Sequence, residues 1–334
     1  MNDVTRAAQA LRAGELVAFP TETVYGLGAD ARNPTALAKI FAAKGRPADH
    51  PLIVHLPDAA HLAQWAIDIP ASAHALAAAF WPGPLTLILK RHPAVPELVT
   101  GGQDTVGLRV PNHPVALALL REFGGEFGNG IAAPSANKFG RISPTTAAHV
   151  QEELGDAVTM ILDGGACAVG IESTIVDMTS ATPRILRPGA ISADTLRQQL
   201  NAPVDDSVTA HPTGETKNMP RVSGSLAAHY APRTPLRLCP VESLPAAVNM
   251  ALQQGKRVAV LAPAVASSLP ANQHIIRRIA SADFSRFAHD LYATLRELDA
   301  AGCDLILVAV PPNDEAWRAV SDRLRRAAAG SGNE

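Results

Sequence analysis

Short apolar segments alternate with longer helical segments along most of this chain, and this alternation limits the fold more than any other feature. Apolar runs of about four to eight residues are typical of strands buried in a sheet. Longer segments with a capping residue in front and a glycine behind are typical of helices. In several places two strand segments follow each other without a helix between them. We therefore predict an α/β protein with a mixed sheet, because consecutive parallel strands need a crossover helix.

The expected strands of the first two hundred residues lie at 16–19, 51–56, 85–89, 105–110, 130–136, 158–162, 173–178 and 184–189. The expected helices lie at 1–14, 33–45, 71–80, 113–124, 143–154 and 192–200. Asn33 and Ser143 are each followed by proline, an order that suits the N-cap and the first position of a helix. The stretch PTETVYGLG, residues 20–28, is expected to be a polar loop after the first strand.

The length of 334 residues favours two domains, since a domain has roughly 100–200 residues. Residues 1–200 are predicted to form one domain built on a mixed twisted sheet. Residues 201–235 are rich in Pro, Thr, Ser and Gly without a regular period, which is typical of a linker. Residues 236–330 resume a regular alternation and are predicted to form a small doubly wound, Rossmann-like domain. No glycine-rich phosphate loop follows the strand predicted at 257–263.

Composition excludes several classes of protein. Lys and Arg number 29 against 31 Asp and Glu, so bulk electrostatic attraction to nucleic acid is not expected. The three cysteines, Cys167, Cys239 and Cys303, form no Cys-x-x-Cys pair and are expected to be core thiols in a reducing compartment. No apolar run approaches the ~20 residues of a membrane span. A cytoplasmic protein without membrane contact is expected.

Polar groups recur where predicted strands or helices end, in the segments PTETVYGLG, KGRP, PLIVH, VGLRVP, PSANKFG, ESTIVD and LRPG. Each has a structural explanation when taken alone: Lys44 suits a helix C-terminus, and His55 could be a satisfied half-buried histidine. Neither a Walker A motif, nor G-x-G-x-x-G, nor G-x-S-x-G is present. The recurrence at successive strand ends favours a ligand site, because ligands of open α/β sheets gather at such edges.

These motifs, in this order, resemble the threonylcarbamoyl-AMP synthase family in its long form, with a YrdC-like catalytic domain and an extra C-terminal domain. The segments that carry the resemblance are PTETVYGLG, KGRP, PLIVH, WPGPLT, RVP, PSANKFG, DGG, GIESTIVD, LRPG and HYAP. The resemblance implies a nucleotidyltransferase that makes threonylcarbamoyl-AMP and pyrophosphate from L-threonine, bicarbonate and ATP. Its product would pass to the transferase machinery that forms threonylcarbamoyladenosine in tRNA, with at most a weak contact to tRNA itself.

The resemblance also implies roles for individual residues. Lys44 and Arg46 are expected to act in catalysis by stabilising charge. The expected ATP-binding residues are Lys44, Arg46, His50, Thr105, Ser135, Asn137, Ser143, Arg187 and Tyr230. The expected L-threonine-binding residues are Thr23, His55, Arg109, Ala133 and Ser173. Mg²⁺ is expected to arrive with ATP, held by phosphates and water, and no protein ligand is assigned to it.

The reaction also gives the linker a role, because its labile intermediate must be kept from water. The segment around HYAP is therefore expected to close over the active site as a lid. Phe139 in PSANKFG stands where a small residue is expected. Two other functions are possible from the sequence. One is a carbamoyl transferase that uses carbamoyl phosphate, and the other is a double-stranded RNA-binding module that uses Lys44, Arg46, Lys138, Arg141 and Arg187. The net charge of −2 and the 4% of aromatic residues argue against RNA binding.

Overall fold

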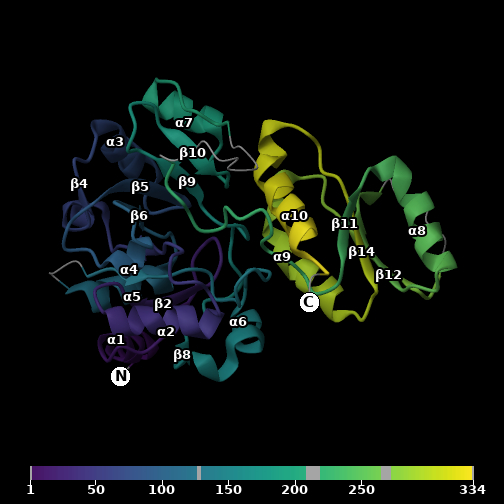
Figure 1. The fold of residues 1–334 in the computed structure, drawn as a ribbon, viewed down its shortest axis with the longest axis horizontal. Helices are drawn as coiled ribbons and strands as arrows, with labels where there is room; N and C mark the ends of the chain where they lie inside the picture. The colour runs from purple at the N-terminus through teal and green to yellow at the C-terminus, as the bar shows by residue number, and fades with distance from the viewer. Residues whose placement is uncertain (1, 126–128, 208–218, 265–271, 333–334) are drawn as a thin grey trace. The chain divides into compact units, whose positions relative to one another are not determined.

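The computed structural model describes residues 2–125, 129–207, 219–264 and 272–332 (Figure 1). The chain divides into two compact units. The first unit contains residues 1–139 and 143–225, and the second contains residues 140–142 and 226–334. The boundary at 225/226 falls inside the segment that the sequence marks as a linker.

The first unit is built on a mixed sheet in which parallel and antiparallel pairs are interspersed, as predicted. The order of its strands is β10-β9-β5-β6-β3-β7-β2-β1-β8, and β4 pairs with β5. The strands are β1 Val17–Phe19, β2 Gly26–Asp30, β3 Ile53–His55, β4 Ala66–Ile67, β5 Leu85–Arg91, β6 Thr105–Arg109, β7 Ile131–Ala132, β8 Met160–Ile161, β9 Thr174–Asp177 and β10 Arg184–Arg187.

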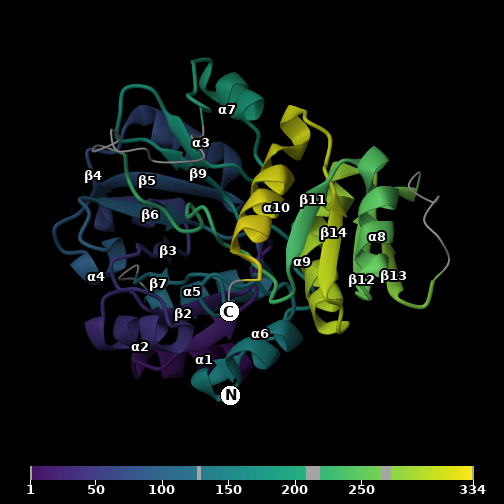
Figure 2. The same ribbon diagram turned by 45° about the vertical axis from the view of Figure 1, so that its right-hand side comes forward.

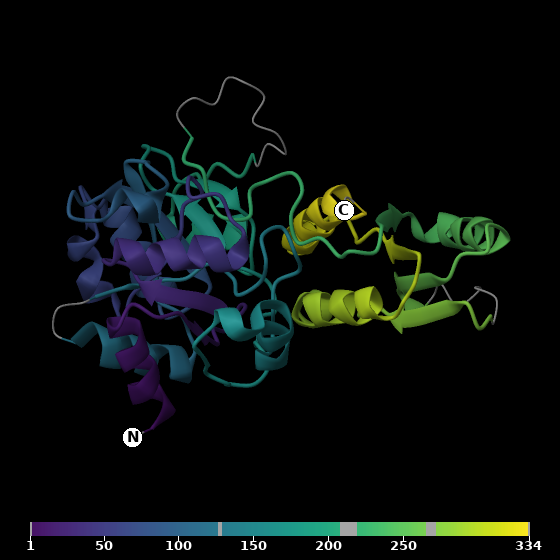
Figure 3. The same ribbon diagram turned by 60° about the horizontal axis from the view of Figure 1, so that its bottom comes forward.

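Helices cover both faces of this sheet. They are α1 Asp3–Arg12, α2 Pro34–Lys44, α3 Ala71–Phe80, α4 Glu97–Thr100, α5 Pro114–Gly124, α6 Ala147–Leu154 and α7 Ala193–Leu200, with 3₁₀ turns at Ala59–Gln64 and Gly155–Ala157. Alternation along β1 separates the faces, since Val17 and Phe19 join the core under α1 and α5 while Ala18 joins the core under α2. Figure 3 shows the purple strands β1 and β2 between α2 on one side and α1 with α5 on the other.

Local sequence signals explain helix α2, which carries part of the candidate site at its end. The Asn33 side chain accepts hydrogen bonds from the backbone N–H groups of Thr35 and Ala36, and Pro34 occupies the first helical position. Gly45 ends the helix with φ 61°, in the left-handed region that glycine adopts without strain. The helix therefore delivers Lys44 and Arg46 at a fixed point beside the sheet.

The second unit has a sheet whose described strand pairs are all parallel, in the order β11-β14-β12-β13. Its strands are β11 Leu236–Cys239, β12 Val258–Ala262, β13 Ile275–Ile279 and β14 Leu305–Ala309. Its helices are α8 Leu244–Gln253, α9 Phe284–Ala300 and α10 Arg318–Gly330, with 3₁₀ turns at Val241–Ser243 and Glu315–Trp317. Helix α8 covers one face of this sheet, and α9 and α10 cover the other (Figure 2). The predicted doubly wound domain is confirmed.

Three sequence-based expectations for the secondary structure are wrong. The stretch 20–28 is not all loop, because Gly26–Asp30 forms strand β2, antiparallel to β1. Helix α6 begins at Ala147 with Thr146 as its N-cap, so Ser143 and Pro144 do not open it. Strands β11 and β13 were not expected, and β13 carries two arginines with largely exposed side chains, which hid its strand character. None of the described helices is long and apolar enough to cross a membrane.

Candidate active site

The polar turn after β1 is held rigid by its own hydroxyl groups. The Thr21 hydroxyl donates to the carbonyl oxygen of Val24 at 2.7 Å and lies 2.8 Å from the Thr23 hydroxyl. It also accepts from the backbone N–H groups of Thr23 and Val24. All of these side chains are buried. The crowded polar groups therefore form an ordered turn between two antiparallel strands, and the turn fixes the direction of the residue between the threonines, Glu22.

Glu22 faces Arg109, the last residue of β6. A Glu22 carboxylate oxygen lies 2.7 Å from Nη2 of Arg109, and both side chains are almost fully buried. The Nε–H group of Arg109 donates to the carbonyl oxygen of Gly83 at 3.3 Å. A buried guanidinium fixed in this way is suited to a carboxylate ligand, because its donors form a planar fork.

His55 lies beside Arg109 at the end of the neighbouring strand, since β3 and β6 pair with these two residues in register. Burial, followed by the positive charge of Arg109, lowers the pKa of His55 to about 3. The imidazole is therefore neutral at physiological pH, with one nitrogen able to donate and one able to accept. The Phe19 ring contacts it edge-on, with ring centroids 6.0 Å apart.

Ser173 and Arg187 join the ends of β9 and β10. The Arg187 guanidinium donates to the Ser173 carbonyl oxygen through Nε and Nη2, and to the Ser173 hydroxyl at 3.1 Å. The Thr86 hydroxyl of β5 lies 2.8 Å from the same serine hydroxyl. The glycine of LRPG is required here, because a Cβ on Gly189 would come within 2.3 Å of the Thr174 backbone nitrogen. These contacts place a buried hydroxyl and a guanidinium together.

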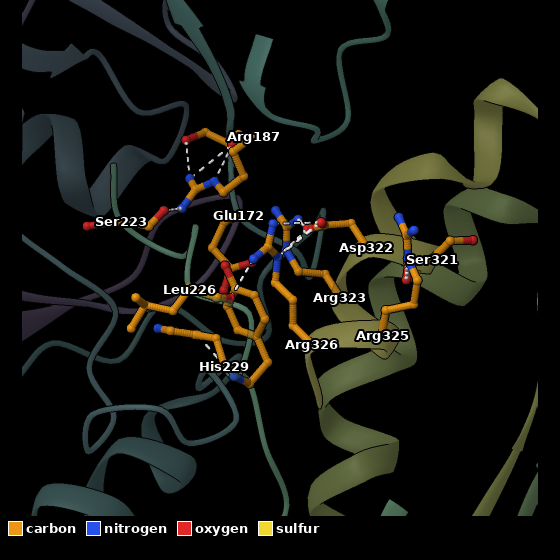
Figure 4. A network of polar contacts seen from close by, with 12 residues as sticks. Glu172, Arg187, Ser223, Leu226, His229, Ser321, Asp322, Arg323, Arg325 and Arg326 are labelled. Carbon is orange, nitrogen blue, oxygen red and sulfur yellow. Dashed lines mark hydrogen bonds and ion pairs between the residues drawn. The ribbon is translucent and has the colours of Figure 1, made fainter. Parts of the chain in front are cut away.

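Arg187 and Arg46 also share a partner from residues 219–225, a described part of the linker segment within the first unit. Arg187 donates to the Ser223 carbonyl oxygen at 2.9 Å, a contact that Figure 4 shows from close by. Arg46 donates to the Ser223 hydroxyl at 3.1 Å and to the Pro51 carbonyl oxygen at 2.9 Å. Ser223 therefore lies between two arginines that the sequence assigns to ATP.

Lys44 connects the end of α2 to the PSANKFG segment. Its ammonium group donates to the backbone carbonyl oxygens of Ser135 and Asn137. Burial lowers the pKa of Lys44 well below its ordinary value, and the charge of Arg46 adds to this effect. Among the groups that the structure describes, these two carbonyl oxygens occupy two of the three ammonium donors of Lys44.

His50 and Arg46 both contact Phe139. The His50 and Phe139 rings meet edge-on, with centroids 5.2 Å apart, and the Arg46 guanidinium lies 5.8 Å from the Phe139 ring centre. Burial, and then the charge of Arg46, lowers the pKa of His50. Phe139 stands where a small residue was expected. It therefore packs against two residues of the predicted ATP site.

Ser143 is buried and donates a 2.6 Å hydrogen bond to a Glu172 carboxylate oxygen. The sequence predicts this serine at the start of a helix, and the N-terminal amides of a helix favour an anion nearby. Since α6 begins after it, that argument does not apply to Ser143. Its hydroxyl instead fixes Glu172, the residue before Ser173.

The remaining predicted site residues lie in different places. Ala133 is buried and donates its backbone N–H to the Ile53 carbonyl oxygen, next to β3. Thr105 begins β6, so the length of that strand, about 13 Å, separates it from Arg109 at the other end. Tyr230 belongs to the second unit. There it stacks on Tyr292, with Arg323 5.2 Å from its ring centre, and adopts φ 61°.

The segment around HYAP is held by helix α10 within the second unit. Arg326 donates to the Leu226 carbonyl oxygen, and its own carbonyl oxygen accepts from the His229 backbone N–H at 3.2 Å. Asp322 pairs with Arg323 at 2.7 Å and with Arg326 at 3.0 Å, as the dashed lines of Figure 4 show. Both ends of the described linker segment therefore have defined partners.

Several residues of this site were not predicted from the sequence to be functional. Glu22, Thr86 and Glu172 are polar residues buried beside predicted site residues. Ser223 was expected as a linker residue able to reach a ligand, and it contacts Arg46 and Arg187. Polar residues next to a site motif were the available signal for Glu22 and Glu172. No local signal marked Thr86, because it lies inside an apolar strand.

Carboxylates are the side chains beside this site that could hold a metal ion directly. Among the described residues, no group of three or more His, Cys, Asp or Glu is placed to hold a metal ion. The two carboxylates beside the site, Glu22 and Glu172, face Arg109 and Ser143. The cations Lys44, Arg46 and Arg187 suit the phosphates that would carry the metal.

Comparison with known proteins indicates one family along almost the whole chain. A family model described as "Telomere recombination" (Sua5/YciO/YrdC) matches residues 9–189, and "Threonylcarbamoyl-AMP synthase, C-terminal domain" matches residues 191–329. Threonylcarbamoyl-AMP synthase of Bacillus subtilis is 39% identical, over 98% of this chain and 93% of the relative. The synthase of Pyrococcus abyssi is 38% identical, over 96% of this chain and 92% of the relative.

A solved structure agrees with the sequence comparisons. The crystal structure of P. abyssi Sua5 complexed with L-threonine is similar with a TM-score of 0.87 and 36% identity, over 98% of this chain and 94% of that chain. The fold class and the family resemblance predicted from the sequence are thus confirmed. The chain therefore belongs to the family of threonylcarbamoyl-AMP synthases, in the long form that joins a Sua5/YciO/YrdC domain to a C-terminal domain, and is an enzyme of their nucleotidyl-transferring kind.

Proposed function

We propose that this chain makes threonylcarbamoyl-AMP and pyrophosphate from L-threonine, bicarbonate and ATP. The observation that carries the proposal is the buried Arg109 guanidinium, with a neutral His55 in register beside it. The guanidinium suits the carboxylate of an amino acid, and the imidazole suits a hydroxyl-bearing side chain. The P. abyssi relative was crystallised with L-threonine, which favours the same ligand here.

The proposed reaction depends on charge stabilisation more than on acid–base catalysis. The threonine nitrogen forms a bond to the carbon of bicarbonate and one water is released, which gives a carbamate. A carbamate oxygen then attacks the α-phosphorus of ATP as pyrophosphate leaves. Lys44, Arg46 and Arg187 would bind the nucleotide and stabilise the charge on its phosphates. Burial lowers the pKa of Lys44 because its ammonium group is taken out of water. An incoming phosphate would favour the charged form of this group. Mg²⁺ carried on the phosphates would neutralise part of the developing charge.

The contacts of Ser223 give residues 219–225 a place in this reaction. They hold the segment against Arg46 and Arg187, which are the residues proposed for ATP. A segment in this position would limit the access of water to the carbamate, which water breaks down. This supports the lid function expected for the linker.

The product is a reactive mixed anhydride, so an acceptor enzyme must use it before water does. We infer that it passes to the machinery that transfers the threonylcarbamoyl group to tRNA, and that the protein works in the cytoplasm. The free and buried state of Cys167, Cys239 and Cys303 is consistent with a reducing compartment.

One assay separates this function from its alternatives. Pyrophosphate release from ATP should require both L-threonine and bicarbonate, and mass spectrometry should find labelled carbon from bicarbonate in the product. A carbamoyl transferase would instead consume carbamoyl phosphate without that double requirement. An RNA-binding module would bind RNA with a steep salt dependence and show no turnover. Either result would contradict the proposed function.

A further inference from the structure

Glu22 is a buried carboxylate with unmet hydrogen-bonding capacity. Neither of its oxygens accepts a hydrogen bond from any group that the structure describes, although one lies 2.7 Å from Arg109 Nη2. The N–H groups of that nitrogen do not point along the short line between the two atoms, since the same Nη2 also makes no hydrogen bond to the described groups. Carboxylates taken out of water normally accept several hydrogen bonds, so an occupant that supplies donors would complete this site.

The turn holds this carboxylate in place before any ligand arrives. The Glu22 carbonyl oxygen accepts a 2.7 Å hydrogen bond from the backbone N–H of Val169. The residues on either side, Thr21 and Thr23, are held through the Thr21 hydroxyl. Other titratable groups facing Glu22 are His113 and Cys167, whose pKa values respond to its charge. The backbone of Glu22 is therefore fixed on both sides, so its side chain starts from a defined point beside Arg109.

The charges at this point match one class of ligand. An inorganic anion would be attracted by Arg109 but repelled by Glu22 at the same place. An α-amino acid carries a carboxylate and an ammonium group on adjacent atoms, so it can face both side chains at once. Its ammonium group also supplies three donors to carboxylate oxygens that have none. The pair thus fits the head of a zwitterion better than it fits an anion alone.

We infer that Glu22 binds the amino group of the amino-acid substrate while Arg109 binds its carboxylate. This rests on the proposed function, and it adds to that function a residue that fixes the reacting nitrogen. The nitrogen that takes up carbon would otherwise turn about the bond to the α-carbon. Holding both ends of the amino-acid head sets the nitrogen at one position, which is the purpose of substrate positioning.

Calorimetric titration of two ligands into two proteins tests this assignment. The ligands are L-threonine and (R)-3-hydroxybutyrate, which is L-threonine without its amino group. The proteins are the wild type and Glu22→Gln, which keeps the shape of the side chain and removes its charge. We expect the wild type to bind L-threonine about tenfold to hundredfold more tightly than (R)-3-hydroxybutyrate, the range of a charged hydrogen bond. In Glu22→Gln this preference should fall to less than about threefold.

The outcome separates ligand binding from a structural role. If Glu22 only neutralises Arg109, the substitution changes the affinity of both ligands by the same factor, and the preference of the wild type survives. That result would overturn the inference. Glu97→Gln, on the short helix α4, is the matched control and should keep the wild-type preference.

Two further results have a defined meaning. If Glu22→Gln does not fold, Glu22→Asp keeps the charge and withdraws the carboxylate by one methylene, and it should weaken L-threonine binding while leaving (R)-3-hydroxybutyrate binding unchanged. Equal weakening of both ligands in Glu22→Asp would again overturn the inference. Failure of the wild type to bind L-threonine at all would overturn the proposed substrate, whereas tight binding without the expected preference would overturn only the role of Glu22.

Discussion

Arg46 donates a hydrogen bond to the Ser223 hydroxyl at 3.1 Å, across a separation of 177 residues in the chain. Arg46 is one of the two residues expected to act in catalysis, and Ser223 belongs to the segment expected to act as a lid. The same serine accepts through its carbonyl oxygen from Arg187. The linker segment therefore already contacts the two arginines that ATP would need, so its position and nucleotide binding should be coupled.

Amide hydrogen exchange measures this coupling directly. Residues 220–232 should gain protection when ATP and L-threonine are both bound, because the ligands would add contacts to a segment that already contacts Arg46 and Arg187. The exchange of helix α3, in the first unit, serves as an internal reference. Unchanged exchange of the segment during active turnover would show that it is only a spacer.

Arg46→Ala and Lys44→Ala should each lower kcat/KM for ATP about tenfold to hundredfold, since each removes a charged hydrogen bond of about 1.5–3 kcal/mol. Lys44→Ala should also destabilise the fold, because Lys44 holds the carbonyl oxygens of Ser135 and Asn137. Thermal unfolding separates the two effects. Lys39→Ala on the same helix removes an exposed ion pair with Glu15 and should change neither quantity. Normal rates at limiting ATP in both variants would remove these residues from the nucleotide site.

L-Threonine should be preferred to L-serine by about 10-fold to 200-fold in kcat/KM, the range that one missing methyl group produces in an apolar pocket. The hydroxyl group cannot discriminate, because both amino acids carry it. Steady-state rates with each amino acid at fixed ATP and bicarbonate measure the ratio. Equal values would contradict a dedicated threonine pocket.

His55 should make folding stability fall as the solution becomes acidic. Its pKa is lowered to about 3 in the folded protein, against an ordinary value of 6.5, so only the unfolded chain takes up the proton between these values. The stabilisation is complete above pH 6.5 and is lost as the pH falls. Between pH 7 and pH 5 this residue should remove about 2 kcal/mol from the free energy of unfolding.

Chemical denaturation of the wild type and His55→Asn at both pH values checks this prediction. The loss of stability between pH 7 and pH 5 should be smaller in the variant by that amount. His74→Asn, on helix α3, should lose as much as the wild type. An equal loss in His55→Asn would show that the imidazole is protonated in the folded protein.

Local sequence was sufficient wherever a segment satisfies its own hydrogen bonds. Asn33, Pro34 and Gly45 define the two ends of α2, and the structure shows all three in the expected positions. The family motifs were also readable as short strings, which is why the family and the fold class could be predicted before the structure. Local signals failed at β2, whose glycines lack strand preference. A Cβ on Gly28 would come within 2.8 Å of the Phe19 ring, so packing between strands explains that residue.

The arrangement of the site was decided by contacts between distant segments. The pair Ser143–Pro144 has the local pattern of a helix start, yet the Ser143 hydroxyl is used by Glu172 and the helix begins later at Ala147. Glu22 and Arg109 are far apart in the sequence and meet only because a turn after β1 faces the end of β6. Local sequence was enough to predict most of the helices and strands and the residue types of the site, but not β2, β11 or β13. Which charged groups share a buried space follows only from the order of the strands in the sheet, because that order brings distant segments together.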